Sequence, residues 1–245
     1  MNSFMTFFKI EAKLVWKSID ILIFGILFPI ILGSIFGYTL SKDSAGSGAS
    51  NFDLSYASVI TIGILATGVM GLSLTLADYR HRGILQRLQV TPVSPLQIVI
   101  AQGLVQMIAA VISFIGVTLV YLFAFGYELQ GSWPLFLISY VYVLISMFSI
   151  GTLIGSLVRD TKSANLWSSA AYFSMLLFSG ATIPYEIMPS FLQWGMDVFP
   201  LAHGIHLLKD VSTGADLSNS LLHIGILGMC IILSMGITIR YFRWK

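Results

Sequence analysis

Histidines, carboxylates and basic side chains are the groups through which this chain could do chemistry, and the histidines closest in sequence are His203 and His206. Their spacing of three residues places both rings on one face of a helix, as a metal site would require. No cysteine or third histidine lies close by in the sequence, so carboxylates alone would have to complete the ligand set. We therefore expect no metal site here, and we expect His223 to satisfy its ring by hydrogen bonding.

Nucleotide chemistry is disfavoured by a motif that the chain lacks. The phosphate-binding loop G-x-x-x-x-G-K-[ST] is absent, and no Gly-Lys pair occurs in the 245 residues. None of the four histidines is spaced with a carboxylate so as to form an acid/base pair inside an apolar segment. The sequence therefore predicts a chain that is not itself an enzyme and that binds no cofactor of its own.

Long apolar runs must position whatever polar groups act in this protein. Hydrophobic residues make up 56% of the sequence and charged residues 10%, and the mean hydropathy is +0.87. A helix needs about 20 mainly apolar residues to cross the hydrocarbon core of a bilayer. The runs that meet this requirement are Ile21–Leu40, Tyr56–Ala77, Leu96–Phe125, Trp133–Val158, Ala164–Thr182 and Leu221–Ile239. The prediction is an all-α membrane protein with six transmembrane helices.

The basic residues give these spans a direction. Eleven of the thirteen lysines and arginines fall on one side of the predicted spans, and the exceptions are Lys42 and Lys209. Because basic residues are retained in the cytoplasm during insertion, both termini are predicted to be cytoplasmic. An even number of spans requires the same arrangement.

Residues 1–20 predict an amphipathic helix that lies along the membrane surface. At 100° per residue, three lysines share a polar face, and aromatic and aliphatic residues occupy the rest. Glu11 breaks the pattern because it projects from the apolar side, where an unpaired carboxylate is costly. Two interpretations stay open: Glu11 reaches the lipid headgroups, or it forms a salt bridge to a protein partner on the cytoplasmic face. Within the chain itself, Arg80 or Arg82 is the nearest candidate for such a pair.

The loop at residues 78–95, between the second and third predicted spans, reads DYRHRGILQRLQVTPVSP. As a short helix, it places Ile84, Leu85 and Leu88 in one apolar sector with polar side chains opposite, and its prolines end the helix. An exposed apolar stripe on a basic loop favours docking on another protein. The alternative is an ordinary basic loop with a turn.

This loop resembles the coupling helix of ABC type-2 exporter permeases, whose pattern is acidic/basic-Gly-Thr-Leu-x-Arg-Leu-x-x-Thr-Pro-Val-Ser. The differences are Ile84 where threonine is frequent and Asp78 where glutamate is more common. A second stretch is similar to the family's pattern at the outer end of the fifth span: FSGATIP at residues 178–184, Glu186, Pro189, Trp194 and Phe199-Pro200. The resemblance covers the whole chain in order.

The resemblance implies a single permease domain, residues 1–245, with an interfacial helix at 1–20, a cytoplasmic coupling helix in the 78–95 loop and outer re-entrant helices at 183–208. A separate ABC ATP-binding subunit would hold ATP and magnesium. Two permeases, identical or related, would work over two such ATPases, with no nucleic acid involved. The residues implied to couple to the ATPase are Arg80, Arg82, Gly83, Ile84, Leu85, Arg87, Leu88 and Pro92.

The resemblance also implies a path for substrate along the second and fifth spans. Export of an apolar or amphipathic substrate, such as a drug, peptide or lipid-like molecule, from the cytoplasm or inner leaflet of a bacterial plasma membrane is the expected function. By position, the path residues are Thr67, Met70, Ser73, Tyr172, Met175 and Phe178, and the outer gate residues are Pro184, Glu186 and Pro189. Ordinary packing is the alternative for the path residues.

A channel or a secondary transporter with six spans and no ATPase partner is the competing function. No Asp, Glu, Lys or Arg lies within a predicted span, which disfavours ion- or proton-coupled transport. Only the resemblance of the 78–95 loop disfavours a channel.

Overall fold

The structure, a computed structural model, describes residues 3–40, 51–84, 95–158, 160–182, 189, 193, 195–215 and 217–241. This part of the chain is helical and contains no strand. Its elements in chain order are α1 (Ser3–Val15), η1 (Ile21–Leu27), α2 (Phe28–Leu40), α3 (Asn51–Ile64), η3 (Leu65–Leu72), α4 (Ser73–His81), α6 (Pro95–Leu119), η4 (Val120–Ala124), α7 (Trp133–Leu157), α8 (Thr161–Phe178), α10 (Pro200–Ser212), η6 (Leu217–Ser220) and α11 (Leu221–Tyr241). The predicted all-α class is confirmed.

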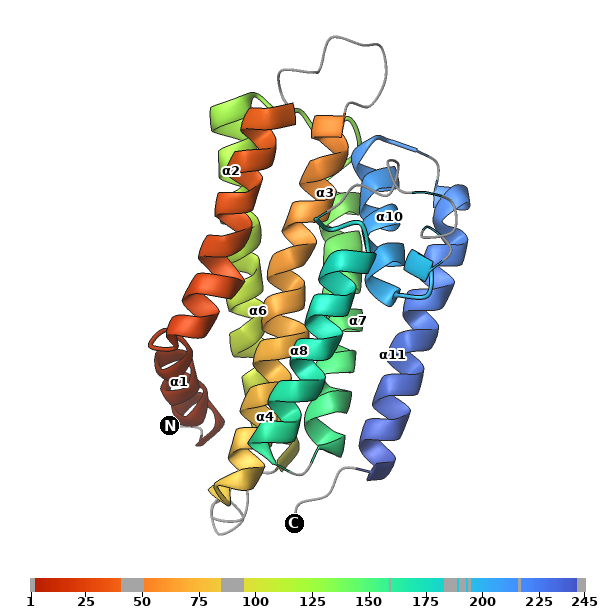
Figure 1. Cartoon of the computed structure of the whole chain (residues 1–245). Helices are drawn as coiled ribbons and strands as arrows, with labels where there is room; N and C mark the ends of the chain where they lie inside the picture. The colour runs from red at the N-terminus through yellow and green to blue at the C-terminus, as the bar shows by residue number, and fades with distance from the viewer. Residues whose placement is uncertain are drawn as a thin grey trace.

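Several elements join into longer helices that form an elongated bundle (Figure 1). The π-helical segments η1, η3 and η4 continue into or from the α-helices beside them. The helices long and apolar enough to cross a membrane, within the described residues, are Ile21–Leu40, Phe52–His81, Gln97–Ala124, Trp133–Leu157 and Leu221–Arg240. They match five of the six predicted runs, with ends that differ by four residues at most.

The remaining predicted run, Ala164–Thr182, corresponds to α8. This helix is not among those long and apolar enough to cross a membrane. Its 18 residues begin with a polar half that contains Lys162 and Asn165. In Figure 1, α8 nevertheless runs alongside η3 and α4 within the bundle. It packs against α4 and η3, so its buried side contacts protein.

The continuous helix formed by α3, η3 and α4 lies at the centre of the bundle. Of its most apolar stretch, 78% is buried, against 22% for the Ile21–Leu40 helix and 17% for the Leu221–Arg240 helix. Aromatic rings fill the space around its first turns, where the Tyr56 and Phe136 ring centroids lie 5.6 Å apart. Because the outer helices leave large apolar side chains exposed, their outward faces suit a lipid environment.

Small residues let α7 approach this central helix closely. A Cβ atom added to Gly151 would lie 1.9 Å from the carbonyl oxygen of Gly68 in η3. One added to Gly155 would lie 3.0 Å from the carbonyl oxygen of Ser73 in α4. The two backbones are therefore in contact, as glycine allows between membrane helices.

Helix α10 belongs to the segment that the sequence assigns to an outer re-entrant element. It begins at Pro200, where the missing backbone N–H costs nothing, and most of its residues are buried against α3, α7 and α11. In Figure 1 it occupies only the upper part of the bundle. The helix continues to Ser212, four residues beyond the predicted limit of 208.

Candidate functional site

The candidate site lies at the lower end of the bundle in Figure 1, where α4 ends, α6 begins, α7 ends and α8 begins. Helix α4 ends at His81, and Gly83 follows with a φ of +64°. The Gly83 amide donates to the Arg80 carbonyl at 3.0 Å. Glycine adopts this left-handed conformation without strain, so the chain leaves the helix sharply here. The described residues continue to residue 84, within the predicted coupling segment, and resume at residue 95.

Arg80 ties the end of α4 to the end of α7. Its guanidinium donates to the carbonyl oxygens of Val158 at 2.6 Å and Gly155 at 2.9 Å. The last carbonyls of a helix have no partner within the helix and carry its negative dipole end. A cation that donates to two of them therefore caps α7 with charge-assisted hydrogen bonds.

Asp160 fixes the start of the next helix, α8. Its side chain accepts hydrogen bonds from the Ser163 amide at 2.8 Å and the Ser163 hydroxyl at 3.1 Å. These hydrogen bonds, led by the one from the backbone amide, lower the pKa of the Asp160 carboxyl. The turn between α7 and α8 is thus capped on both sides, by Arg80 before it and by Asp160 after it.

Glu11 joins α1 to the same region. Its side chain is 3% exposed, and the Tyr79 hydroxyl lies 2.5 Å from each carboxylate oxygen. The Gln102 amide also donates to the carboxylate and lies 3.0 Å from the Tyr79 hydroxyl. Burial raises the pKa of Glu11, and the two hydrogen bonds oppose that effect.

This geometry corrects both interpretations of Glu11. The carboxylate is buried rather than directed to headgroups, and its partners are neutral rather than cationic. The predicted salt bridge with Arg80 or Arg82 is wrong because Arg80 turns toward α7 and Arg82 pairs with Asp78 at 2.8 Å. Arg82 is 68% exposed, so that ion pair lies on the surface.

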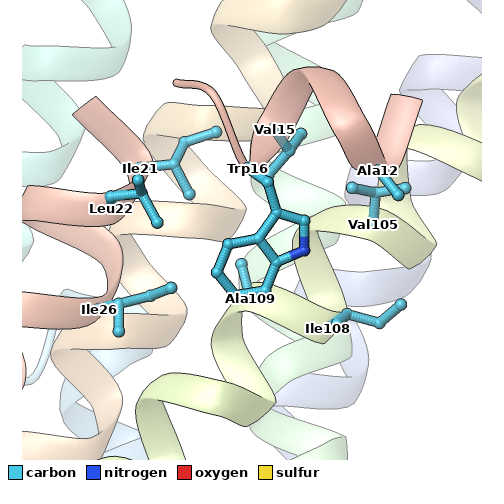
Figure 2. A pocket seen from close by; sticks show the side chains of 9 residues that line it. All are labelled: Ala12, Val15, Trp16, Ile21, Leu22, Ile26, Val105, Ile108 and Ala109. Carbon is cyan, nitrogen blue, oxygen red and sulfur yellow. The ribbon is translucent and has the colours of Figure 1, made fainter. Parts of the chain in front are cut away.

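Apolar contacts hold α1 in the position that the Glu11 contact needs. Ala12 and Val15 of α1, with Trp16 after it, face Val105 and Ile108 of α6 across a small pocket of about 50 Å³. Figure 2 shows the Trp16 indole in the middle of this pocket, between α6 and the first turns of the helix that follows. Because α1 and η1 both pack against α6, the turn between them lies against the bundle.

The predicted coupling residues are only partly within the described chain. Ile84 is half-buried and packs with Phe7 of α1 around Tyr79 and Ile98. It therefore contributes to the chain's own packing rather than to a free apolar stripe. Arg80, Arg82 and Gly83 have been described above, whereas Leu85, Arg87, Leu88 and Pro92 lie outside the described residues.

The predicted path residues fall into two groups. Thr67 and Ser73 are fully buried in the bundle, and the Ser73 hydroxyl lies 2.5 Å from that of Ser168 on α8. Tyr172 and Met175 are also buried, whereas Phe178 is 45% exposed. Met70 is half-buried and lines a cavity of about 520 Å³. The second and fifth predicted spans thus pack directly on each other within one chain.

The upper end of the bundle brings together three histidines. His203 Nδ1 lies 2.9 Å from His223 Nδ1, and the His206 and His223 ring centroids are 5.2 Å apart. His203 Nε2 lies 2.9 Å from the Asp197 carbonyl oxygen, which can only accept, so the proton is on Nε2 and a neutral His203 accepts from His223. Hydrogen bonding of His223 is confirmed. Its place beside His203 was not predicted because 20 residues separate them.

The outer gate residues are the least described part of the prediction. Pro184 and Glu186 lie outside the described residues. Pro189 is exposed, and its carbonyl oxygen accepts from the Gln193 amide at 3.1 Å.

Comparisons with known proteins match this architecture to one family. A family profile described as "ABC-2 family transporter protein" matches residues 38–240. The inner membrane transport permease YhhJ of Escherichia coli K12 is 26% identical over 133 residues, which are 54% of this chain and 36% of that protein. The probable multidrug ABC transporter permease YbhR of the same strain is 28% identical over 155 residues, 63% of this chain and 41% of that protein.

A third relative matches over more of its own length. The putative transport permease YvfS of Bacillus subtilis is 23% identical over 194 residues, 75% of this chain and 74% of that protein. For the two E. coli relatives, by contrast, the match spans less than half of the relative. Because the family profile covers most of the sequence, this multi-pass membrane protein belongs to the ABC-2 family of transport permeases.

Proposed function

We propose that this chain is the permease subunit of an ATP-driven exporter, energised by a separate ABC ATP-binding subunit that docks on residues 78–95. Two permeases would stand over two such ATPases, which hold the ATP and magnesium. In this proposal α8 is the fifth of six spans, both termini are cytoplasmic, and the lower end of the bundle faces the ATPase. Family membership supports the general function, and the relatives' names include a multidrug transporter permease.

The observation that carries the docking proposal is the way the end of α4 is tied to its neighbours. Tyr79 contacts Glu11 of α1 and Gln102 of α6, and Arg80 binds the end of α7. A push on the segment that follows residue 82 would therefore move three helices together. A loop without such ties would yield locally and transmit little, because displacement passes between elements through packed and hydrogen-bonded contacts.

An apolar or amphipathic substrate suits the proposal because the outward faces of the bundle are apolar. Thr67 and Ser73 are buried against their neighbours within one chain, so in this proposal substrate passes beside these residues or between two copies of the chain. Met70 and Phe178 stay candidates for direct contact. Pro184, Glu186 and Pro189 are kept in the proposal as the outer gate.

Reconstitution tests the proposal. Proteoliposomes are prepared with the purified full chain alone, with its partner ATPase alone and with both, and ATP hydrolysis and movement of a fluorescent amphiphile are measured. ATP-dependent movement is expected only when both proteins are present. Robust hydrolysis by the isolated chain, or movement that needs no ATPase, would refute the proposal, and the second result would favour a channel or secondary transporter.

A further inference from the structure

A cavity of about 520 Å³ lies between the helix that starts at η1, the central helix and the start of α8. We name it the Asp20 cavity. Its polar residues are all at the lower end of these three helices: Ser18, Asp20, Thr75, Thr161 and Asn165. Each of the three helices contributes at least one of them. The cavity therefore has a polar end built by three separate parts of the chain.

The other end of the Asp20 cavity is apolar. Phe24 and Ile21 line it from η1, and Met70, Leu74 and Ala66 line it from the central helix. These residues lie further along the helices, toward the middle of the bundle, than the polar group does. A ligand that fills this space must therefore carry a polar head and an apolar body.

Among the residues that the structure describes, Asp20 is the only charged one that lines this cavity. It is exposed, and its side chain forms no hydrogen bond or ion pair with the residues that the structure describes. A second cavity of about 780 Å³, between α7 and α8, offers a useful contrast because Asp160 lines it. The Asp160 carboxylate already accepts two hydrogen bonds from Ser163 at the start of α8, whereas the Asp20 carboxylate is available to a ligand.

The position of Asp20 along the chain specifies the ligand further. It directly precedes Ile21, the first residue of a helix that is apolar enough to span a membrane. A carboxylate at that point lies at the level of lipid headgroups, and the apolar end of the cavity lies at the level of acyl chains. A small hydrophilic cation would gain nothing from Phe24 and Met70, whereas an amphipathic one uses both ends.

We propose that the Asp20 cavity binds an amphipathic cation, with Asp20 pairing its charged head and the Phe24, Met70 and Leu74 side chains enclosing its apolar body. In the exporter proposed above, this cavity is where such a substrate is held before transport, so that role rests on the proposed function. Binding itself requires neither ATP nor an ATPase.

Direct binding to the full chain in phosphatidylcholine nanodiscs tests the site. The probe is a dansyl-labelled amphiphile that ends in trimethylammonium, compared with its uncharged tert-butyl isostere, and empty nanodiscs correct for partition into lipid. Asp20→Asn is expected to weaken binding of the cation about two- to fivefold, as for an exposed ion pair, with the affinity for the isostere unchanged. Asp20→Glu should keep the cation affinity within about twofold. Glu128→Gln removes an exposed carboxylate from the other end of the bundle and should change the affinity for neither ligand.

A matched pair of substitutions on α8 tests the location of the site. Asn165 and Ala170 are both exposed, and Asn165 lines the Asp20 cavity whereas Ala170 lines the α7–α8 cavity. Asn165→Phe should weaken the binding of both ligands about tenfold by filling the cavity. Ala170→Phe should weaken the binding of neither. Equal cation affinity in wild type and Asp20→Asn, or an effect of Ala170→Phe alone, would overturn the site. Loss of transport in the reconstituted complex with binding intact would count against the proposed function and leave the site standing.

Discussion

The Tyr79 hydroxyl lies 2.5 Å from both carboxylate oxygens of Glu11, 68 residues earlier in the chain. This contact joins the N-terminal amphipathic helix to the last turn of the central helix, where the segment proposed to meet the ATPase begins. Tyr79 and Gln102 provide neutral donors to a buried carboxylate, so the contact depends on hydrogen bonding and burial rather than on an ion pair. It is therefore sensitive to single substitutions and to pH.

Tyr79→Phe should loosen α1, because it removes a hydrogen bond to a buried carboxylate. A hydrogen bond to a charged group contributes about 1.5–3 kcal/mol, and the docking of α1 should weaken by about that amount. Hydrogen–deuterium exchange of residues 3–15 in nanodiscs measures this loss directly. Tyr142→Phe is the control, since the Tyr142 hydroxyl donates to the Ile224 carbonyl oxygen and should loosen α11 instead. Unchanged exchange in α1 after Tyr79→Phe would show that apolar packing alone holds it.

The docking of α1 should also strengthen as the pH falls. Burial raises the pKa of Glu11 in the docked state, so this state takes up a proton at a higher pH than the undocked one. The stabilising contribution is complete below the ordinary pKa of a glutamate and is lost as the pH rises through the raised value. Glu11→Gln should remove this pH dependence, and the free Gln102 Oε1 atom can accept from the new amide if Gln102 reorients. The exchange rate of α1 must first be corrected for the intrinsic effect of pH on amide exchange. A corrected rate in the wild type that does not vary with pH would contradict this account.

Arg80→Met should destabilise the protein more than Arg82→Met, although both remove one positive charge. Arg80 donates to two carbonyl oxygens at the end of α7, whereas Arg82 forms an exposed pair with Asp78. We expect a loss of about 1.5–3 kcal/mol in the free energy of unfolding for Arg80→Met and less than about 1 kcal/mol for Arg82→Met. Unfolding in mixed micelles, titrated with a denaturing detergent, provides both values. The reverse order would mean that the cap on α7 is unimportant.

The histidine cluster should make the protein less stable in acid. Burial, followed by the nearby His223 and Lys209, lowers the pKa of His206 to about 4, while Asp197 and Asp210 oppose that effect. The unfolded chain therefore binds more protons between about pH 6.5 and 4, and stability falls as the pH drops through that window. The maximum effect is about 3 kcal/mol below pH 4.

His206→Gln should flatten this acid-side loss of stability, which thermal unfolding between pH 7 and pH 4 would measure. His81→Gln is the control because His81 is exposed at the opposite end of the bundle. An identical pH profile for wild type and His206→Gln would rule out His206 as the titrating group.

Accessibility labelling tests the proposed orientation. With Cys230 replaced, single cysteines at Ser47, Glu128 and Asp216 should react with a membrane-impermeant reagent in intact cells, while cysteines at Gln86 and Lys162 should react only after lysis. The expectation follows from the concentration of basic residues on one side of the predicted spans. Labelling of Gln86→Cys from outside would show that the orientation is the reverse of the proposed one.

Five of the six predicted spans correspond to helices apolar enough to cross a membrane, because membrane insertion depends on long-range average hydropathy, which the sequence displays directly. Glu11 could be recognised as anomalous for the same reason, since it interrupts an apolar face. Its partners could not be predicted by matching opposite charges, because a phenol and a carboxamide stabilise the carboxylate. Tyr79 and Gln102 become partners only through the packing of α1 against α4 and α6.

Other features depend on tertiary structure in the same way. The polar first half of α8 is tolerated because Ser168 meets Ser73 inside the bundle. His223 meets His203 because α10 packs on α11, a contact between separate helices that periodicity cannot reveal. The Asp20 cavity likewise needs three helices that are distant in the chain.

Substrate-stimulated ATP hydrolysis in the reconstituted complex tests the central claim most directly, namely that a separate ATPase drives this permease through the 78–95 segment. Leu85→Ala and Leu88→Ala are compared with Arg82→Ala and wild type, with insertion and amphiphile binding checked for each variant. Truncating a packed apolar anchor should cost about 1–3 kcal/mol of docking, so the leucine variants should still bind substrate but lose the response of hydrolysis to it, while Arg82→Ala changes little. Full stimulation in both leucine variants, with uncoupling in Arg82→Ala, would contradict the account.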